Sequence, residues 1–155
     1  MNEQQLTQLL DSKGIPYRVI RHKPVFNIEE ACRELGVSPD AEVKNLLLKD
    51  DLGFFLLIAV GSTRVDYKAV AAARGTKKVR MTQADEVKEK TGVEVGSVNL
   101  FSYSEVLVDS RVVALAEINT HPDDNTITLM IPTGPALGLL KNKTVGEFCT
   151  ESVQE

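Results

Sequence analysis

Residues 42–60 read EVKNLLLKDDLGFFLLIAV, two apolar runs separated by a polar turn. The runs at residues 43–49 and 54–60 predict two strands, and residues 50–53 predict the turn of a hairpin between them. Lys44 does not fit a plain core strand. On local grounds a lysine at this position is most often an edge-strand residue that keeps its ammonium in water. The alternative is a cation held at a substrate site.

Further helices and strands are predicted on both sides of this hairpin. The helices have side-chain caps at their starts or glycines at their ends. They span residues 3–13, the stretch from Asn27 to Gly36, the stretch from Asp66 to Gly75, residues 83–90 after Thr82, and residues 136–140. The remaining strands are predicted at residues 17–21, 77–81, 106–108, 112–118, 126–131 and 145–148.

This order of elements predicts the fold class. Helices interleave with strands, which is typical of parallel pairing, but tight hairpins are also present, so the sheet should be mixed. The 155 residues suffice for one hydrophobic core, and no linker or repeat divides the chain. We therefore expect one α/β (α+β) domain over residues 1–155, with a mixed, curled central sheet flanked by helices.

Composition and charge exclude several classes of protein. The apolar (43%) and charged (26%) fractions are those of an ordinary globular protein, and the polar N-terminus does not look like a signal peptide, so we expect a cytoplasmic protein. The net charge of -4 argues against a general nucleic-acid coat protein. Residues 64–80 contain six basic residues and a single acid. This basic run is either a solvated surface or a local patch that binds phosphate at the end of a nucleic-acid strand.

Several catalytic signatures are missing from the chain. There is no GxSxG elbow, no P-loop and no GxGxxG followed by an acid. Only two histidines and two cysteines occur, and none has the spacing of a metal site. An enzyme with this sequence must therefore use a substrate that is already activated or that supplies a catalytic group.

Four features stand out together: residues 22–26 (HKPVF), Lys44 with Asn45, the glycine loop at residues 96–101 (GSVNLF), and His121 followed by proline. In order and spacing they resemble the YbaK/prolyl-tRNA synthetase-associated editing-domain family, the free-standing aminoacyl-tRNA deacylases, with a ProX-like branch. The likeness extends over LLDSKGIPYRVIRHKPVFNIEEA, VKNLLLKDDLGFFLLIAV, TRVDYKAVAAARGTKKVRM and TGVEVGSVNLF, which is nearly the whole chain.

The resemblance assigns candidate site residues. The family's lysine corresponds to Lys44, its companion asparagine to Asn45, its glycine loop to residues 96–100, and its histidine to His121. Leu100 stands where that loop usually has proline, and because proline would fix the backbone, Leu100 is expected to leave the loop freer. We expect backbone donors from Gly96, Ser97 and Val98, and Phe26 as either core or pocket wall.

The resemblance implies hydrolysis of the ester of a mischarged tRNA, without metal or cofactor. Backbone N–H groups of the glycine loop can stabilise the charge on the carbonyl oxygen, and Lys44 can hold the substrate in register. The implied partners are the tRNA acceptor end and an aminoacyl-tRNA synthetase, with no membrane. The family's usual substrates, tRNA(Pro) carrying alanine or cysteine, are not distinguished by this sequence. The alternative is a non-catalytic module that binds an amino-acid-like ligand, an RNA end or a protein.

Overall fold

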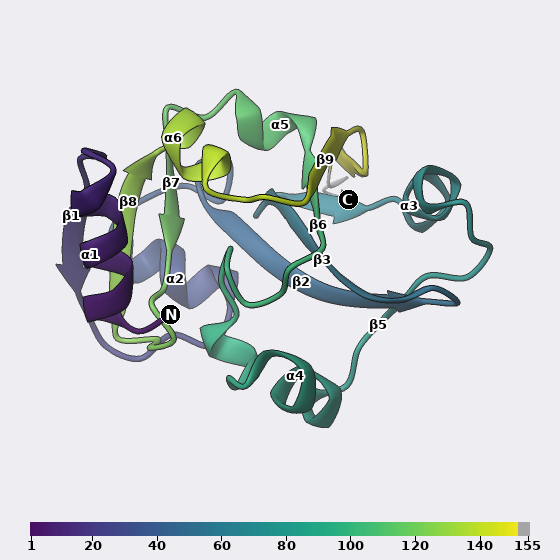
Figure 1. Cartoon of the computed structure of the whole chain (residues 1–155), viewed down its shortest axis with the longest axis horizontal. Helices are drawn as coiled ribbons and strands as arrows, with labels where there is room; N and C mark the ends of the chain where they lie inside the picture. Colours follow the sequence, from purple (N-terminus) through teal and green to yellow (C-terminus); the bar gives the residue numbers. More distant parts are fainter. Residues whose placement is uncertain (152–155) are drawn as a thin grey trace.

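The predicted hairpin is the longest pair of strands in the computed structural model, which describes residues 1–151 (Figure 1). Strands β2 (Val43–Asp50) and β3 (Gly53–Val60) pair antiparallel, with Lys44 opposite Ala59. They belong to a five-stranded sheet of order β5-β2-β3-β6-β9. The other members are β5 (Arg80–Met81), β6 (Val106–Asp109) and β9 (Lys143–Gly146). Because β3, β6 and β9 run parallel, the sheet is mixed, as predicted.

Two smaller antiparallel sheets accompany the central one. The first has the order β1-β8-β7 and contains β1 (Arg18–Arg21), β8 (Ile127–Pro132) and β7 (Glu117–Thr120). The second pairs β10 (Cys149–Glu151) with β4 (Thr63–Val65). The sequence did not predict β4, and it predicted one strand at residues 145–148, where the chain instead leaves β9 and enters β10.

The predicted helices are present, all but the last at nearly their expected bounds; the last begins three residues before the predicted start at residue 136. They are α1 (Glu3–Ser12), α2 (Ile28–Leu35), α3 (Tyr67–Arg74), α4 (Ala84–Thr91) and α6 (Thr133–Gly138). Asn27 and Asp66 cap α2 and α3 as predicted, whereas α4 is capped by Gln83 rather than begun by Thr82. In Figure 1, α4 lies below the hairpin, α5 and α6 lie above it, and α3 lies at its right end.

The predicted strand at residues 112–118 is wrong. The chain there forms the short helix α5 (Ser110–Val113), and β7 begins only at Glu117. The cause is Asp109, whose side chain accepts a hydrogen bond from the Arg111 backbone N–H and caps the helix. A run of apolar residues cannot by itself distinguish a buried helix turn from a strand, and the cap decides here.

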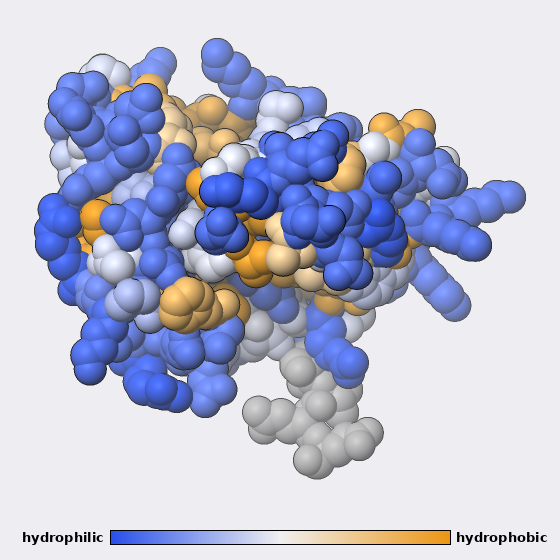
Figure 2. Space-filling model, turned by 90° about the horizontal axis from the view of Figure 1, so that it is seen from below, coloured by the Kyte–Doolittle hydropathy of each residue, from blue (hydrophilic) through white to orange (hydrophobic). Residues whose placement is uncertain are grey.

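The two faces of the hairpin belong to two hydrophobic clusters. Val43, Leu47 and Ile58 join one cluster, and Leu48, Leu57 and Ala59 join the other, as the alternation of a strand requires. By the same alternation Asn45 shares a face with Leu47, and Lys44 shares one with Leu48. The face seen in Figure 2 is largely hydrophilic, with small scattered hydrophobic areas. Among residues 1–151, no helix combines the length and apolar character needed to cross a membrane.

Candidate active site

A small pocket of about 170 Å³ lies beside the first half of β2. Its walls come from the segment before α2, from the first residues of β2, from the 3-10 turn Val95–Ser97, and from His121 after β7. Six of the seven predicted site residues line it: Phe26, Lys44, Asn45, Gly96, Val98 and His121. Ser97 does not line it. Segments almost a hundred residues apart in sequence therefore meet at one cavity.

The pocket exists because the outer edge of β2 is only partly paired. β5 pairs with β2 at Leu48 and Lys49 only. At the start of the strand, the Val43 N–H donates outward to Oδ1 of Asn119 at 2.8 Å. In an antiparallel pair the backbone groups of alternate residues point to the same side. The N–H and C=O of Asn45 therefore face the open edge, where they can bind a ligand.

Lys44 lines the pocket, but its ammonium group lies against the turn between β3 and β4. The Nζ atom donates to the carbonyl oxygens of Gly61, at 3.5 Å, and Thr63. Burial lowers the pKa of this half-buried lysine below its ordinary value. Since an ammonium has three N–H donors, one remains for a further acceptor.

Gly96 is required by a close approach of two chain segments. A Cβ atom on Gly96 would lie 3.1 Å from the Val25 carbonyl oxygen and 3.4 Å from the Phe26 ring. The 3-10 turn begins with the bond from Ser97 N–H to Glu94 C=O (2.9 Å), so the Ser97 N–H is occupied. Gly96 precedes that bond and its N–H has no partner within the turn. Of these two predicted donors, the geometry leaves Gly96 available.

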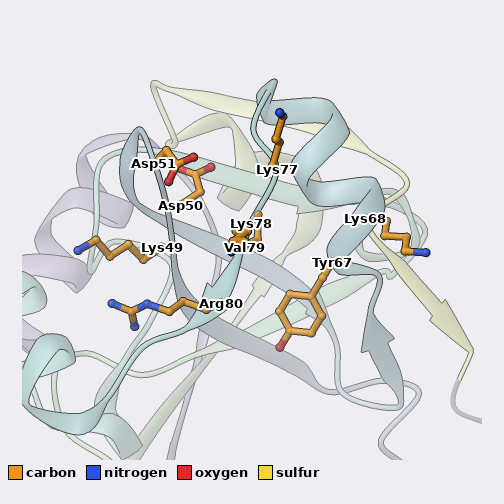
Figure 3. A pocket seen from close by; sticks show the side chains of 9 residues that line it. All are labelled: Lys49, Asp50, Asp51, Tyr67, Lys68, Lys77, Lys78, Val79 and Arg80. Atoms are coloured by element: carbon orange, nitrogen blue, oxygen red, sulfur yellow. The ribbon is translucent and has the colours of Figure 1, made fainter.

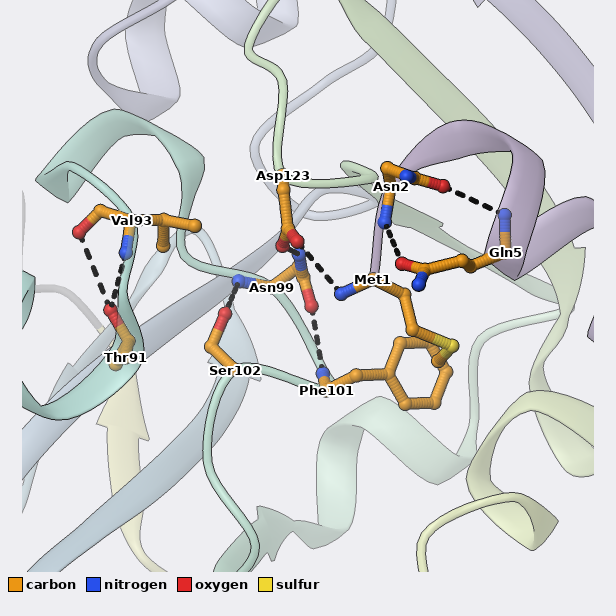
Figure 4. Close-up of polar contacts among 9 residues, drawn as sticks. All are labelled: Met1, Asn2, Gln5, Thr91, Val93, Asn99, Phe101, Ser102 and Asp123. Atoms are coloured by element: carbon orange, nitrogen blue, oxygen red, sulfur yellow. Dashed lines mark hydrogen bonds and ion pairs between the residues drawn. The ribbon is translucent and has the colours of Figure 1, made fainter.

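The glycine loop is firmly attached to the rest of the protein. Leu100 is fully buried in the main hydrophobic cluster, so its side chain anchors the loop. That it leaves the backbone freer than a proline would stays a prediction. The buried Asn99 accepts a hydrogen bond from Phe101 N–H and donates from Nδ2 to Asp123 at 3.0 Å (Figure 4). The amino group of Met1 pairs with the same Asp123. Asn99 thus joins the glycine loop to the turn that follows His121.

His121 is mostly buried, and its surroundings keep the ring neutral. Burial is the main cause that lowers its pKa, with the nearby His22 acting in the same direction. The His121 Nδ1 atom lies 3.1 Å from the Ile127 carbonyl oxygen. A carbonyl can only accept, so we assign the proton of the neutral ring to Nδ1. The Nε2 atom is then an acceptor.

The sequence did not single out Glu42, which lines the pocket, or Asn119, which holds Glu42 in place. Glu42 is 1% exposed, lines the pocket, and accepts a hydrogen bond from the Nδ2 atom of Asn119. Burial raises the pKa of the Glu42 carboxyl to about 7. The only signal in the sequence is an acid placed directly before an apolar strand. Asn119 carried no signal, because its partners lie more than seventy residues away.

A larger groove of about 580 Å³ lies near the other end of β2 (Figure 3). It is lined by Lys49, Asp50, Asp51, Tyr67, Lys68, Lys77, Lys78, Val79 and Arg80. Most of its cations belong to the basic run noted in the sequence. Asp50 is neutralised by the buried Arg74, and Arg80 pairs with Glu86. Figure 3 shows Lys68 pointing away from the other side chains. Lys49, Lys77 and Lys78 remain as the cations of this basic groove.

The fold and the pocket together define an α/β domain with a small pocket of mixed polar and apolar lining at the open edge of a mixed sheet. The chain belongs to the aminoacyl-tRNA editing domain family, whose sequence profile matches residues 22–134. This confirms the family inferred from the sequence and, at the level of the family, an aminoacyl-tRNA editing hydrolase.

Individual relatives agree with this assignment. The chain is 28% identical to the prolyl-tRNA editing protein ProX of Acetoanaerobium sticklandii over 138 residues, which is 83% of this chain and 84% of that protein. It is 35% identical to the proline–tRNA ligase of Bacillus licheniformis over 99 residues, which is 61% of this chain but 17% of the ligase.

Solved structures share the fold. A hypothetical protein of known crystal structure superposes with a TM-score of 0.83 at 22% identity, covering 94% of this chain and 99% of its own. A protein provisionally described as a trans-editing enzyme for prolyl tRNA synthetase gives a TM-score of 0.79 at 18% identity, covering 95% and 96% of the two chains. At these identities the likeness concerns the fold.

Proposed function

We propose that the whole chain is one trans-editing domain that hydrolyses the ester bond of a mischarged tRNA. The substrate is tRNA(Pro) carrying a small wrong amino acid such as alanine or cysteine. The observation that carries this proposal is the pocket of about 170 Å³ that gathers Lys44, Gly96 and His121 in a member of the editing family. The names of the relatives from Acetoanaerobium sticklandii and Bacillus licheniformis support the choice of tRNA(Pro).

The pocket size supports a small amino acid. Its volume suits a side chain of a few heavy atoms, with the ribose and base remaining outside. Phe26 lines the pocket and is 67% exposed, so its ring face is available at the mouth. Aromatic side chains commonly stack on unpaired bases of RNA. We place the terminal adenine of the tRNA on Phe26.

The reaction needs little from the protein because an ester is already reactive. A water oxygen attacks the ester carbonyl carbon and the water gives up a proton. The bond from that carbon to the ribose oxygen breaks, and the ribose oxygen takes up the proton that the water lost. The Gly96 N–H faces the carbonyl oxygen, where one such donor contributes about 3 kcal/mol to the transition state. Lys44 uses its third N–H to hold a substrate oxygen in place.

His121 is the residue best suited to accept a proton or a hydrogen bond. Its neutral ring offers Nε2, and it can orient the attacking water or the ribose 2′-hydroxyl. This role requires the neutral ring, and the lowered pKa keeps the ring neutral at pH 7. No metal or cofactor is needed for these steps.

The basic groove gives the tRNA a second contact. Lys49 lies four residues beyond Asn45 on β2, which corresponds to about 13 Å along the strand. Lys77 and Lys78 offer point charges for phosphates, and the partly exposed ring of Tyr67 offers a stacking surface. An acceptor end with its ester in the pocket can therefore lay its backbone in the groove.

One observation favours a second candidate function. The Lys44 ammonium is engaged by two carbonyl groups and the Ser97 N–H is occupied, as in a rigid module that binds a ligand without chemistry. In this alternative the domain holds an amino-acid-like ligand, an RNA end or a protein partner.

Hydrolysis of labelled alanyl-, cysteinyl- and prolyl-tRNA(Pro) decides between the two functions. The deacylase should release alanine or cysteine much faster than proline. Lys44→Ala should lose most of this activity, while Lys68→Ala, a lysine that points away from the groove, should keep it. If no ester is lost faster than in buffer, the module is the correct function. If Lys44→Ala is as active as the wild type, only the role of Lys44 is wrong.

A further inference from the structure

Two acceptor oxygens beside the pocket have no hydrogen-bond donor. They are Oε2 of Glu42 and Oδ1 of Asn45, and both are buried. Within residues 1–151 only two other buried side-chain oxygens, in Thr120 and Thr133, lack a partner in the same way. Glu42 and Asn45 both line the pocket. Native proteins rarely bury acceptors without donors, so a pair of them at one cavity indicates a missing donor.

The surroundings of Glu42 show what kind of donor is missing. From β7, Asn119 Nδ2 donates to its other oxygen, Oε1. From α2, the Cys32 thiol lies close enough that Glu42, after burial, raises the pKa of the thiol. On β2, the Lys44 ammonium donates to Gly61 and Thr63. Among the described residues, no cation forms an ion pair with Glu42.

A ligand that matches this pair carries a positive charge and several N–H donors in a small volume. A primary ammonium has three N–H donors and can satisfy a carboxylate oxygen and an amide oxygen at once. An esterified amino acid carries one such group, bonded to the carbon next to the ester carbonyl. Asn45 and Lys44 line the same pocket, so an ammonium held at Asn45 keeps the ester in the cavity that the lysine also lines.

We propose that Glu42 and Asn45 form a subsite for the α-ammonium group of the esterified amino acid. This inference rests on the proposed function and adds the chemical group by which the site distinguishes its substrate. A free α-amino group becomes a requirement, so an aminoacyl ester with an acylated nitrogen is rejected. Glu42 is then a positioning residue, because it holds the amino acid and does not touch the bond that breaks.

The test compares alanyl-tRNA(Pro) with N-acetylalanyl-tRNA(Pro). The wild type should favour the free amine at least about tenfold in kcat/KM, which corresponds to ~1.4 kcal/mol. Glu42→Gln, which keeps the size of the side chain, should lose most of this preference, and Asn45→Ala should weaken it. The matched control is Glu34→Gln, an exposed glutamate on α2, which should leave the preference unchanged.

Equal rates on both substrates in the wild type would overturn the subsite, as would an equal loss on both in Glu42→Gln. Binding of alaninamide and N-acetylalaninamide, followed by chemical shifts of the folded protein, separates this inference from the proposed function. If no ester is hydrolysed but alaninamide binds at least about tenfold tighter, and Glu42→Gln removes the difference, the deacylase is wrong and the subsite stands. Equal binding of both amides in that case would overturn the subsite too.

Discussion

Asn119 holds Glu42 against the start of β2. Its Nδ2 atom donates to the Glu42 carboxyl, and its Oδ1 atom accepts the Val43 N–H at 2.8 Å. All three residues are buried, so these bonds are shielded from water. One side chain of β7 therefore fixes both the acid beside the pocket and the first backbone group of the strand that carries Lys44.

Replacing Asn119 should destabilise the fold. Asn119→Ala leaves a buried carboxyl and a buried N–H without their partners, and each such loss costs about 1–3 kcal/mol. We expect the free energy of unfolding in urea to fall by about 2–4 kcal/mol. Asn142→Ala, at an exposed asparagine, serves as control and should change it by less than about 0.5 kcal/mol. A similar small change for both variants would show that the two bonds do not stabilise the protein.

Glu42 should make stability depend on pH between about 4.5 and 7. Its pKa in the folded protein is about 7, above the unfolded value near 4.5, so the folded state binds the extra proton in this range. The stability contributed by this group is complete below pH 4.5 and is lost as the pH rises toward 7, by up to about 3 kcal/mol.

Urea unfolding of the wild type and Glu42→Gln at several pH values measures this effect. The difference in unfolding free energy between the two proteins should change steadily from pH 5 to 7 and then level off. The carboxyl of Glu86 affects stability only at lower pH. Arg80 lowers its pKa to about 2, so the stability that Glu86 contributes is lost only on acidification. If the two proteins respond to pH in parallel, Glu42 does not titrate in this range.

Gly96→Ala should lower activity through geometry. The added methyl group meets the Val25 carbonyl oxygen at 3.1 Å, so the loop must shift and carry the Gly96 N–H away from the substrate oxygen. Loss of one oxyanion donor reduces kcat by about 10²–10³. In Gly134→Ala, the control, the new Cβ has no neighbour within 4 Å. Unchanged kcat in Gly96→Ala would remove the glycine loop from the proposed mechanism.

The basic groove should contribute to the hydrolysis of whole aminoacyl-tRNA but not to the hydrolysis of a minimal aminoacyl ester. The double variant Lys77→Glu, Lys78→Glu should lower kcat/KM for aminoacyl-tRNA and flatten its salt dependence by about 0.7 in logarithmic slope for each phosphate that is no longer neutralised. Hydrolysis of an aminoacyl ester of adenosine should be unaffected. The double variant Lys13→Glu, Lys141→Glu changes two exposed lysines outside the groove and controls for net charge. Equal effects on both substrates, or none, would mean that the RNA does not lie in this groove.

The fold was largely predictable because its signals are local. Asn27 and Asp66 cap helices by bonding to backbone groups three residues away, and Gly36 and Gly75 end them in the left-handed conformation. The prediction failed at residues 112–118, where Asp109 starts a helix within an apolar run. The burial of the Leu100 side chain in the core was not predictable from the sequence, because burial depends on which segments pack around it.

The sequence by itself determined the central hairpin, most helices, and the identity of six residues that line one pocket. Those features depend on alternation, capping, glycine positions and the likeness to a family. Only the tertiary structure decided that Glu42 is buried beside Asn119, and that the Lys44 ammonium lies against Gly61 and Thr63. The physical reason is that burial and unpaired acceptors are created by segments distant in the chain. A carboxyl titrates near pH 7 only when α2, β2 and β7 close around it.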